Sequence, residues 1–291
     1  MHLENERLKI EVQPPGTFYS GARFDWTGLI SQVTLDGTVQ YCVPERLEEG
    51  EGTGGHGFCN EFGLDQPVGY EETAPGQRFP KIGTGLLKKE ADTAYDIFHP
   101  YEVVPASMKV IKEDDAVIFE VSQESPGGYA YHLTKTVRLE GTRLIQAYTL
   151  LNTGQKPLQT NEYSHNFIGM NDTLYNGSYE LTIPGLESLD VVVGELSQQG
   201  ETVTWPVTPT DDVYAGLTLG TGVRDRTYHW DLYHRGLKAG VRDLSPFTPS
   251  KMALWGRAHV ACPEVFIDLR IEPGERASWE RVYEFYREEA E

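Results

Sequence analysis

Polar and apolar residues alternate along much of this chain, and clusters of turn residues separate the alternating runs. Alternating runs that are rich in β-branched and aromatic residues are typical of half-buried strands. They occur at Val117 to Gln123, Tyr131 to Leu139, Arg143 to Leu151, Tyr179 to Ile183, Asp190 to Leu196 and Tyr228 to Val241. No long stretch keeps an apolar period of about 3.6 residues, so helices are expected to be few and short.

Turn residues indicate two hairpins. One joins HLTKTVRL to RLIQAYTLL through Glu140, Gly141 and Thr142, and the other joins VFIDLRI to RASWERVYEFY through a turn with Pro273 and Gly274. No fixed-period repeat is present, which disfavours a propeller or a solenoid. No low-complexity linker divides the chain. We therefore expect one all-β domain over residues 1–291, a large antiparallel β-sandwich.

The region from Pro44 to Pro80 differs from the rest of the chain because it is dense in Gly, Glu, Pro and Gln. A stretch of this length without obvious strands is usually functional or disordered. Its embedded aromatic residues favour an ordered excursion. We expect long loops at one end of the sandwich.

Charge and cysteine content narrow the classes of partner. The formal net charge is −19, whereas binding to nucleic acids or to membrane surfaces requires clustered basic residues. No nucleic-acid or membrane partner is expected. No signal peptide and no long apolar run is readable, and the three widely spaced cysteines suit reduced thiols. These features favour a cytoplasmic location.

The segment QTNEYSHNF concentrates polar, titratable and aromatic residues. Alternate residues of a strand point to opposite faces. The segment is thereby divided into Asn161, Tyr163, His165 and Phe167 on one face, and Glu162, Ser164 and Asn166 on the other. The aromatic neighbours place His165 where its charge can be tuned. The alternative is a structural histidine bonded to a neighbouring carbonyl.

A second segment places Glu264 on an otherwise apolar face with Val260, Cys262 and Phe266. Glutamate is rarely buried without a partner, so Glu264 has a partner, lines a pocket, or lies on a locally frayed and solvated strand. Pro263 beside it cannot donate to a strand ladder, which suggests a bulge or an edge.

In the third segment, GTGGHGFCNEFGLDQPVGY, glycines are interleaved with His56 and Glu61. This pattern suggests a tightly turned loop close to a ligand, or an ordinary surface loop. It matches neither a phosphate-binding P-loop nor the dinucleotide fingerprint. No metal-ligand spacing of the HExxH or paired-cysteine type and no Gly-x-Ser-x-Gly elbow is present. We expect no metal and no cofactor.

Taken in order, these segments resemble the aldose 1-epimerase (galactose mutarotase-like) superfamily, and within it the divergent branch that includes hexose-6-phosphate epimerases. GGHGFCNEFG resembles the glycine-rich turn of the family, and Asn161 to Phe167 its catalytic-histidine segment. Ala261 to Glu264 and Pro273 to Glu275 resemble the catalytic-glutamate strand and the turn that follows it.

The resemblance implies a large antiparallel sandwich that carries a sugar site in an open groove. It implies that Glu264 is the general base and His165 the general acid in the interconversion of α- and β-anomers. Whether the two groups face one another across a gap the size of a sugar would discriminate between an isomerase and its alternatives. The acidic limb of the pH–rate profile would then belong to the carboxylate, and the basic limb to the imidazolium.

The resemblance and the polar residues nearby also suggest groups that bind the sugar. The candidates are His56, Asn60, Glu61, Arg78, Lys81, Glu162, Asn166 and Trp255. Either His56 or Lys81 would fill the role of a second family histidine, because two alignments of this region compete. Arg78, Lys81 and Arg257 leave a phosphorylated sugar open as the substrate.

The expected partner is a small-molecule sugar, and the expected assembly is a monomer or a homodimer. Two alternatives to a sugar isomerase are open. One is a non-catalytic carbohydrate-binding or sensing sandwich, since fold does not fix function. The other is a glycoside hydrolase or lyase, in which Glu162 or Glu61 would act with Glu264 across roughly 5–9.5 Å.

Overall fold

The structure is a computed structural model that describes residues 1–48, 50–220 and 227–288. The described residues form antiparallel sheets and contain no helix, so the all-β prediction is confirmed and the few short helices are not found there. In this part of the chain, accordingly, no helix is long and apolar enough to cross a membrane.

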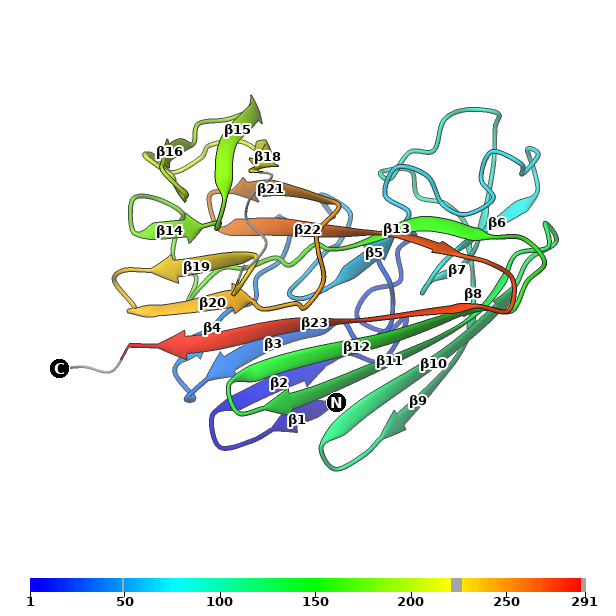
Figure 1. Ribbon diagram of the computed structural model, residues 1–291, viewed down its shortest axis with the longest axis horizontal. Coiled ribbons are helices and arrows are strands. Elements are labelled where there is room, and N and C mark those ends of the chain that lie inside the picture. The colour runs from blue at the N-terminus through cyan, green and yellow to red at the C-terminus, as the bar shows by residue number, and fades with distance from the viewer. Residues whose placement is uncertain (49, 221–226, 289–291) are drawn as a thin grey trace.

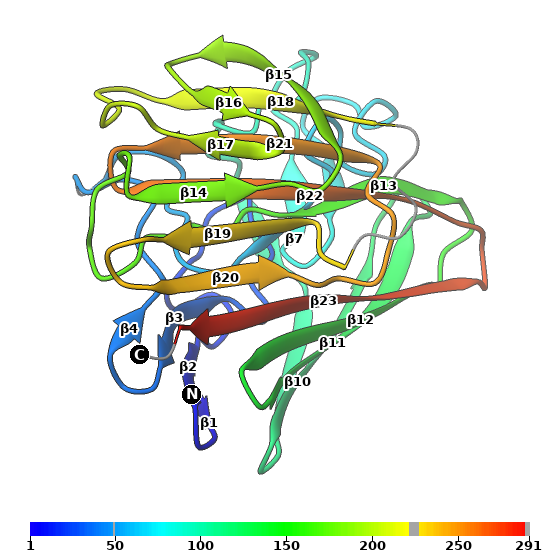
Figure 2. The same ribbon diagram turned by 60° about the vertical axis from the view of Figure 1, so that its left-hand side comes forward.

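A ten-stranded sheet forms one layer of the molecule (Figures 1 and 2). In spatial order its strands are β16 (Ser197–Gln199), β17 (Thr202–Thr204), β14 (Tyr179–Thr182), β19 (Trp230–His234), β20 (Ala239–Asp243), β23 (Arg276–Arg287), β12 (Arg143–Asn152), β11 (Ala130–Glu140), β10 (Ala116–Glu124) and β9 (Ser107–Lys112).

A six-stranded sheet forms the second layer. In spatial order it contains β15 (Leu186–Val193), β18 (Val213–Leu219), β21 (Lys251–Arg257), β22 (Val260–Ile271), β13 (Leu158–Ser164) and β5 (Asn60–Phe62). Leu254 and Val265 of this sheet belong to the same buried apolar cluster as Trp230 and Tyr283 of the ten-stranded sheet. The core therefore lies between the two sheets, as in a sandwich.

Two smaller sheets complete the molecule. One contains β1 (His2–Glu4), β2 (Leu8–Val12), β3 (Ile30–Leu35) and β4 (Val39–Gln40), and the other contains β6 (Arg78–Lys81), β7 (Gly85–Lys88) and β8 (Val103–Pro105). The described part of the region from Pro44 to Pro80 contributes β5 and most of β6, and the loops around β6 lie at one end of the sandwich (Figure 1).

The hairpins predicted by turn residues are present. Strands β11 and β12 pair from Tyr131↔Asn152 to Glu140↔Arg143, and the turn between them contains Gly141 with φ +59°. Strands β22 and β23 are joined by the turn at Gly274, where φ is +82°. The run from Tyr228 to Val241 differs from its prediction, because it forms two strands, β19 and β20, with Lys238 at φ +51° in the turn.

Candidate functional site

His165 and Glu264 lie in direct contact, with His165 Nε2 3.3 Å from Glu264 Oε1. His165 follows the last residue of β13, and Glu264 lies in the neighbouring strand β22. Both residues are buried, with 4% and 6% of their surface exposed. The imidazole and the carboxylate meet each other, and no sugar-sized gap separates them.

The sheet opens where these two side chains project. The ladder between β13 and β22 ends at Ser164↔Val265 and resumes only at the bridge Ile168↔Ala261. Pro263 lies in this interruption. Proline has no main-chain N–H to donate, and no ladder bond to β13 is needed at this position. Its pairing with β21 is regular, so the predicted bulge is not present.

The main chain of the histidine segment pairs with the glycine-rich turn instead. The amide of His165 donates to the carbonyl of Cys59, and the amide of Phe167 donates to the carbonyl of Gly57. At Gly57, where φ is +59°, an added Cβ would lie 2.1 Å from the carbonyl oxygen of Ile30. Glycine is therefore required for the turn to pack beneath the histidine segment.

The pair lies in a pocket of about 210 Å³. This volume is below the roughly 300–1,000 Å³ of pockets for drug-sized ligands, so it suits a monosaccharide better than an oligosaccharide. The lining residues are Arg23, Glu45, Arg46, Leu64, Ile97, Phe98, Tyr163, His165, Asp212, Tyr214, Lys251, Trp255 and Glu264.

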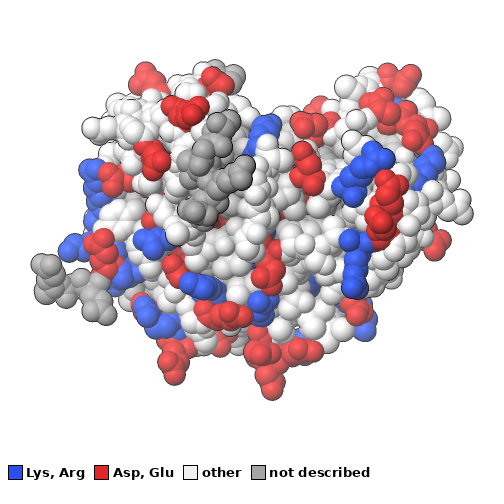
Figure 3. Space-filling model, in the orientation of Figure 1, with Lys and Arg blue, Asp and Glu red and all other residues white. Residues whose placement is uncertain are grey.

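The lining comes from two parts of the molecule. Tyr214 belongs to β18 and Trp255 to β21, whereas Phe98 belongs to the loop between β7 and β8. The outline in Figure 3 is notched between the part that carries β15 and β18 and the part that carries β6 and its loops. Acidic and basic side chains are interspersed over this face (Figure 3).

Aromatic rings surround the imidazole of His165. The ring of Phe167 stacks on it at 4.5 Å between centroids, and Trp255, Phe24 and Tyr163 lie at 5.6, 5.7 and 5.9 Å. These rings remove water from one side of the pair. Trp255, a predicted sugar-binding residue, therefore lies beside the histidine and lines the pocket.

Burial shifts the pKa of both members of the pair. It raises the pKa of Glu264 to about 8, although the positive charges of Arg23 and Lys251 act in the opposite direction. Burial, followed by the charge of Arg23, holds the pKa of His165 well below its usual 6.5. The low-dielectric surroundings disfavour the charged form of each group.

Beneath the pocket, Glu61 is held by three donors. Arg23 Nε and Lys81 Nζ each lie 2.9 Å from the Glu61 carboxylate, and the Tyr163 hydroxyl donates to it at 2.6 Å. Arg23 also donates to the Tyr163 oxygen at 3.0 Å. Glu61 and Lys81 do not line the pocket, because they bond to each other below it, whereas Arg23 and Tyr163 do.

Glu162 and Asn60 belong to a second buried network, between the two sheets. Arg281 of β23 binds the Glu162 carboxylate at 2.7 Å, and the Asn60 amide donates to it at 2.9 Å. Lys135 and Tyr148 donate to the Asn60 side-chain oxygen at 3.1 and 2.7 Å. Glu162 and Asn60, which were expected to bind the sugar, face away from His165 and do not line the pocket.

Three other predicted residues also lie outside the pocket lining. His56 Nε2 lies 3.0 Å from the carbonyl of Ser31. Arg78 pairs with the exposed Glu102 at 2.5 Å. Asn166 is 1% exposed and points into the interior, as expected for the strand face opposite His165. No residue of the glycine-rich segment from Gly52 to Gly63 is in the pocket lining.

Pocket residues that the sequence did not single out include Arg23, Arg46, Asp212, Tyr214 and Lys251. Asp212 binds Arg46 through both guanidinium nitrogens, at 2.7 and 3.0 Å. Arg257 joins Asp212 at 3.0 Å. The Arg46 guanidinium lies 5.7 Å from the centre of the Trp255 ring. These contacts join segments far apart in the sequence, so no local pattern indicates them.

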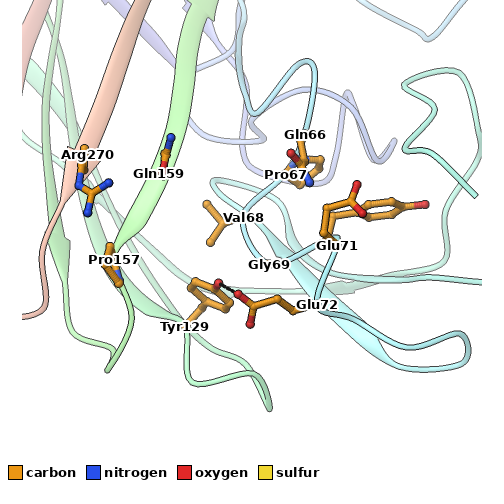
Figure 4. A pocket seen from close by; sticks show the side chains of 11 residues that line it. Gln66, Pro67, Val68, Gly69, Glu71, Glu72, Tyr129, Pro157, Gln159 and Arg270 are labelled. Atoms are coloured by element: carbon orange, nitrogen blue, oxygen red, sulfur yellow. Dashed lines mark hydrogen bonds between the residues drawn. The ribbon is translucent and has the colours of Figure 1, made fainter. Parts of the chain in front are cut away.

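A larger hollow of about 410 Å³ lies near the opposite end of β13 (Figure 4). Gln159 and Arg270 border it on one side, and Glu71 and Glu72 border it on the other. Tyr129 donates to Glu72 at 2.8 Å. The side chains around it include no buried titratable pair, so the smaller pocket has the better chemistry for a reaction. Among the described residues, no three His, Cys, Asp or Glu side chains form a metal-binding group.

Comparison with solved structures identifies the fold. A galactose mutarotase-like protein from Lactobacillus casei shares 13% identity, with a TM-score of 0.62 and coverage of 98% of this chain and 99% of that one. A galactose mutarotase related enzyme from Lactobacillus acidophilus shares 10% identity, with a TM-score of 0.58 and coverage of 98% and 97%. An aldose epimerase homologue from C. elegans shares 11% identity, with a TM-score of 0.54 and coverage of 99% and 98%.

The chain therefore has the galactose mutarotase-like fold over nearly its full length, and the resemblance read from its sequence is confirmed at the level of the fold. The sequence matches no model of a known protein family, and comparison with curated proteins also found no match.

Proposed function

We propose that this protein is a sugar isomerase of the aldose 1-epimerase type, which interconverts the α- and β-anomers of a monosaccharide. The observation that carries the proposal is the contact between His165 and Glu264 at 3.3 Å, inside a pocket of about 210 Å³. The names of the structural neighbours support the same class of reaction, although at this identity the likeness concerns the fold alone.

The reaction requires a proton transfer at each of two oxygen atoms to open the ring, and the reverse transfers to close it. One group takes the proton of the anomeric hydroxyl while another protonates the ring oxygen, and the bond between C1 and the ring oxygen breaks. Rotation about C1–C2 and closure on the other face give the second anomer. A carboxyl and an imidazole that share a proton can perform both transfers, and each contributes about 10²–10⁴-fold.

The other lining residues would bind and orient the sugar. Trp255 offers an apolar surface beside His165, and Arg23, Tyr163, Tyr214 and Lys251 offer polar groups at the pocket. The volume supports a monosaccharide substrate. We also propose a cytoplasmic location, because Cys42, Cys59 and Cys262 are free and buried.

A non-catalytic carbohydrate-binding sandwich is the second candidate. The direct contact of His165 with Glu264 favours it, because the two groups interact with each other and need no substrate as a partner. A hydrolase has less support. Glu61 and Glu162 are each held by cations and do not line the pocket beside Glu264.

Mutarotation of freshly dissolved α-anomers tests the proposal. A panel of hexoses and pentoses would be followed by polarimetry or by NMR of the anomeric protons, with and without protein. Acceleration above the buffer rate for at least one sugar is expected. Binding of a sugar without any acceleration would favour the non-catalytic candidate.

A further inference from the structure

The shared proton of the pair can be arranged in two ways. Either Glu264 is ionised and His165 is an imidazolium, or Glu264 is a neutral acid and His165 a neutral imidazole. Both arrangements contain the same number of protons, so they differ only in where one proton resides. The contacts of each group decide between them.

Glu264 lacks the donors that the other buried glutamates have. Glu61 is bound by Arg23, Lys81 and Tyr163. Glu162 is bound by Arg281 and Asn60, and Glu45 accepts from Thr53 and Gly55. Among the described residues, by contrast, no Lys, Arg or main-chain donor binds Glu264, and its single ion-pair partner is His165. A buried carboxylate without donors is costly, whereas the neutral acid is not.

The neighbours of Glu264 come from every strand packed against it. Lys251 and Trp255 lie on β21, Tyr214 on β18 and Tyr163 on β13, while Arg23 and Glu61 contribute charge from β5 and the loop beside it. The cations Arg23 and Lys251 favour the carboxylate, and Glu61 disfavours it. Glu61, which Arg23 shares with Lys81, offsets part of the charge of Arg23 at Glu264.

The surroundings of His165 are equally unfavourable for a charge. A neutral imidazole that accepts from Glu264 at Nε2 carries its proton on Nδ1, so Nδ1 is a donor in both arrangements. The lack of a side-chain partner at Nδ1 therefore does not choose between them, whereas the surroundings of the ring do. Four aromatic rings lie within 6 Å of the imidazole, and Arg23 adds a like charge.

From these contacts we infer that the resting pair is neutral, with its proton on Glu264, so that Glu264 protonates the ring oxygen while His165 accepts the anomeric proton. This is the reverse of the roles that the family resemblance implies. The inference rests on the proposed function for the direction of catalysis, but the position of the resting proton stands independently of turnover.

The steps balance without a co-reactant. The Glu264 carboxyl gives its proton to the ring oxygen, the bond from C1 to that oxygen breaks, and the proton of the anomeric hydroxyl passes to His165 as the aldehyde forms. The open-chain sugar then faces a Glu264 carboxylate and a His165 imidazolium. After rotation about C1–C2, the hydroxyl attacks C1, its proton returns to Glu264, and His165 protonates the new anomeric oxygen.

Infrared spectroscopy can locate the proton, because only a protonated carboxyl shows a carboxylic-acid C=O band. At neutral pH the difference spectrum between the wild-type protein and Glu264→Gln is expected to show such a band; taking the difference removes any band of the buried Asp25, whose pKa is also raised by burial. The band should disappear as the pH rises through about 8, where Glu264 ionises. Glu102→Gln, at an exposed ion pair, is the matched control and should leave the band unchanged.

A second measurement needs no variant at Glu264. The ¹⁵N NMR shifts of His165, assigned by their loss in His165→Asn, distinguish a neutral imidazole from an imidazolium in the wild-type protein. A neutral ring at neutral pH is expected. A doubly protonated ring, together with no acid band from Glu264, would overturn the inference even if the protein were an active isomerase. If the Glu264 acid band were present in a protein without mutarotase activity, the position of the proton on Glu264 would be confirmed and the proposed function rejected.

Discussion

Tyr163 donates a hydrogen bond to Glu61 at 2.6 Å, and this bond joins the pocket to the buried charge cluster beneath it. Tyr163 also stacks on Phe266 with ring centroids 4.4 Å apart. Glu61 further holds the Arg23 guanidinium, which lines the same pocket. One buried carboxylate therefore positions two pocket residues that lie far apart in the sequence.

Replacing Glu61 by Gln should weaken both sugar binding and folding. Arg23 and Lys81 would be left buried without a counter-charge, and removing one partner of a buried ion pair typically costs about 3–5 kcal/mol. Chemical denaturation measures the loss in the free energy of unfolding. Glu102→Gln is the control and should change stability little, because its partner Arg78 is at the surface. An unfolding midpoint for Glu61→Gln equal to that of the wild type would show that the cluster is not needed.

The pH dependence of the mutarotation rate should be bell-shaped. The pKa values of the buried pair assign its acidic limb to His165 and its basic limb to Glu264. As the pH falls through the pKa of His165, which lies below 6.5, the imidazole gains a proton and can no longer accept one. As the pH rises through about 8, Glu264 loses the proton that it must donate. This order reverses the limbs implied by the resemblance. A rate profile over this range measures both limbs, and a rate that keeps rising well above pH 8 would contradict the assignment.

Gly57→Ala should destabilise the protein by several times more than Gly274→Ala. Both glycines have positive φ, at +59° and +82°, so both substitutions incur the strain of a left-handed backbone, about 1–2 kcal/mol. At Gly57 the new Cβ would also lie 2.1 Å from the Ile30 carbonyl oxygen, whereas at Gly274 no atom lies within 4 Å. Thermal unfolding of the two variants isolates the effect of the close contact. Equal losses of thermal stability in the two variants would show that the turn at Gly57 can move away from the new Cβ with little loss of free energy.

The chain should unfold as one domain. The two large sheets share one buried apolar cluster, and Arg281 of β23 binds Glu162 of β13 across the space between them. Denaturation followed by tryptophan fluorescence and by circular dichroism should therefore give coincident transitions. Limited proteolysis that released two stable halves would contradict this prediction.

The strands were readable from the sequence because one face of each is buried. In β11, for example, buried and partly exposed residues alternate along nearly the whole strand. The face rule also applied to the site. It placed Tyr163 and His165 together, and both line the pocket. The same rule placed Glu162 and Asn166 on the opposite face, so their proposed contact with the sugar already conflicted with the pattern.

The remaining features depend on pairings between distant segments. Arg23 comes from a loop and reaches Glu61 through a contact that spans 38 residues. Asp212 meets Arg46 across 166 residues. The alternation of polar and apolar residues along a strand does not indicate contacts between segments so far apart. The direct contact between His165 and Glu264 was also not predictable, because it depends on the interrupted ladder between β13 and β22.

The most direct test of the account is the mutarotation rate of Glu264→Gln beside that of the wild type, on the sugar that the wild type converts fastest. Glutamine keeps the shape of the side chain but cannot exchange a proton with the ring oxygen, so kcat should fall by about 10²–10⁴-fold while KM changes little. The kcat of His165→Asn should fall by a similar factor. The kcat of the double variant should fall by less than the product of the two single factors. Trp255→Phe should act mainly on KM. A rate for Glu264→Gln close to that of the wild type, across several sugars, would contradict the assignment of this pair as the catalytic site.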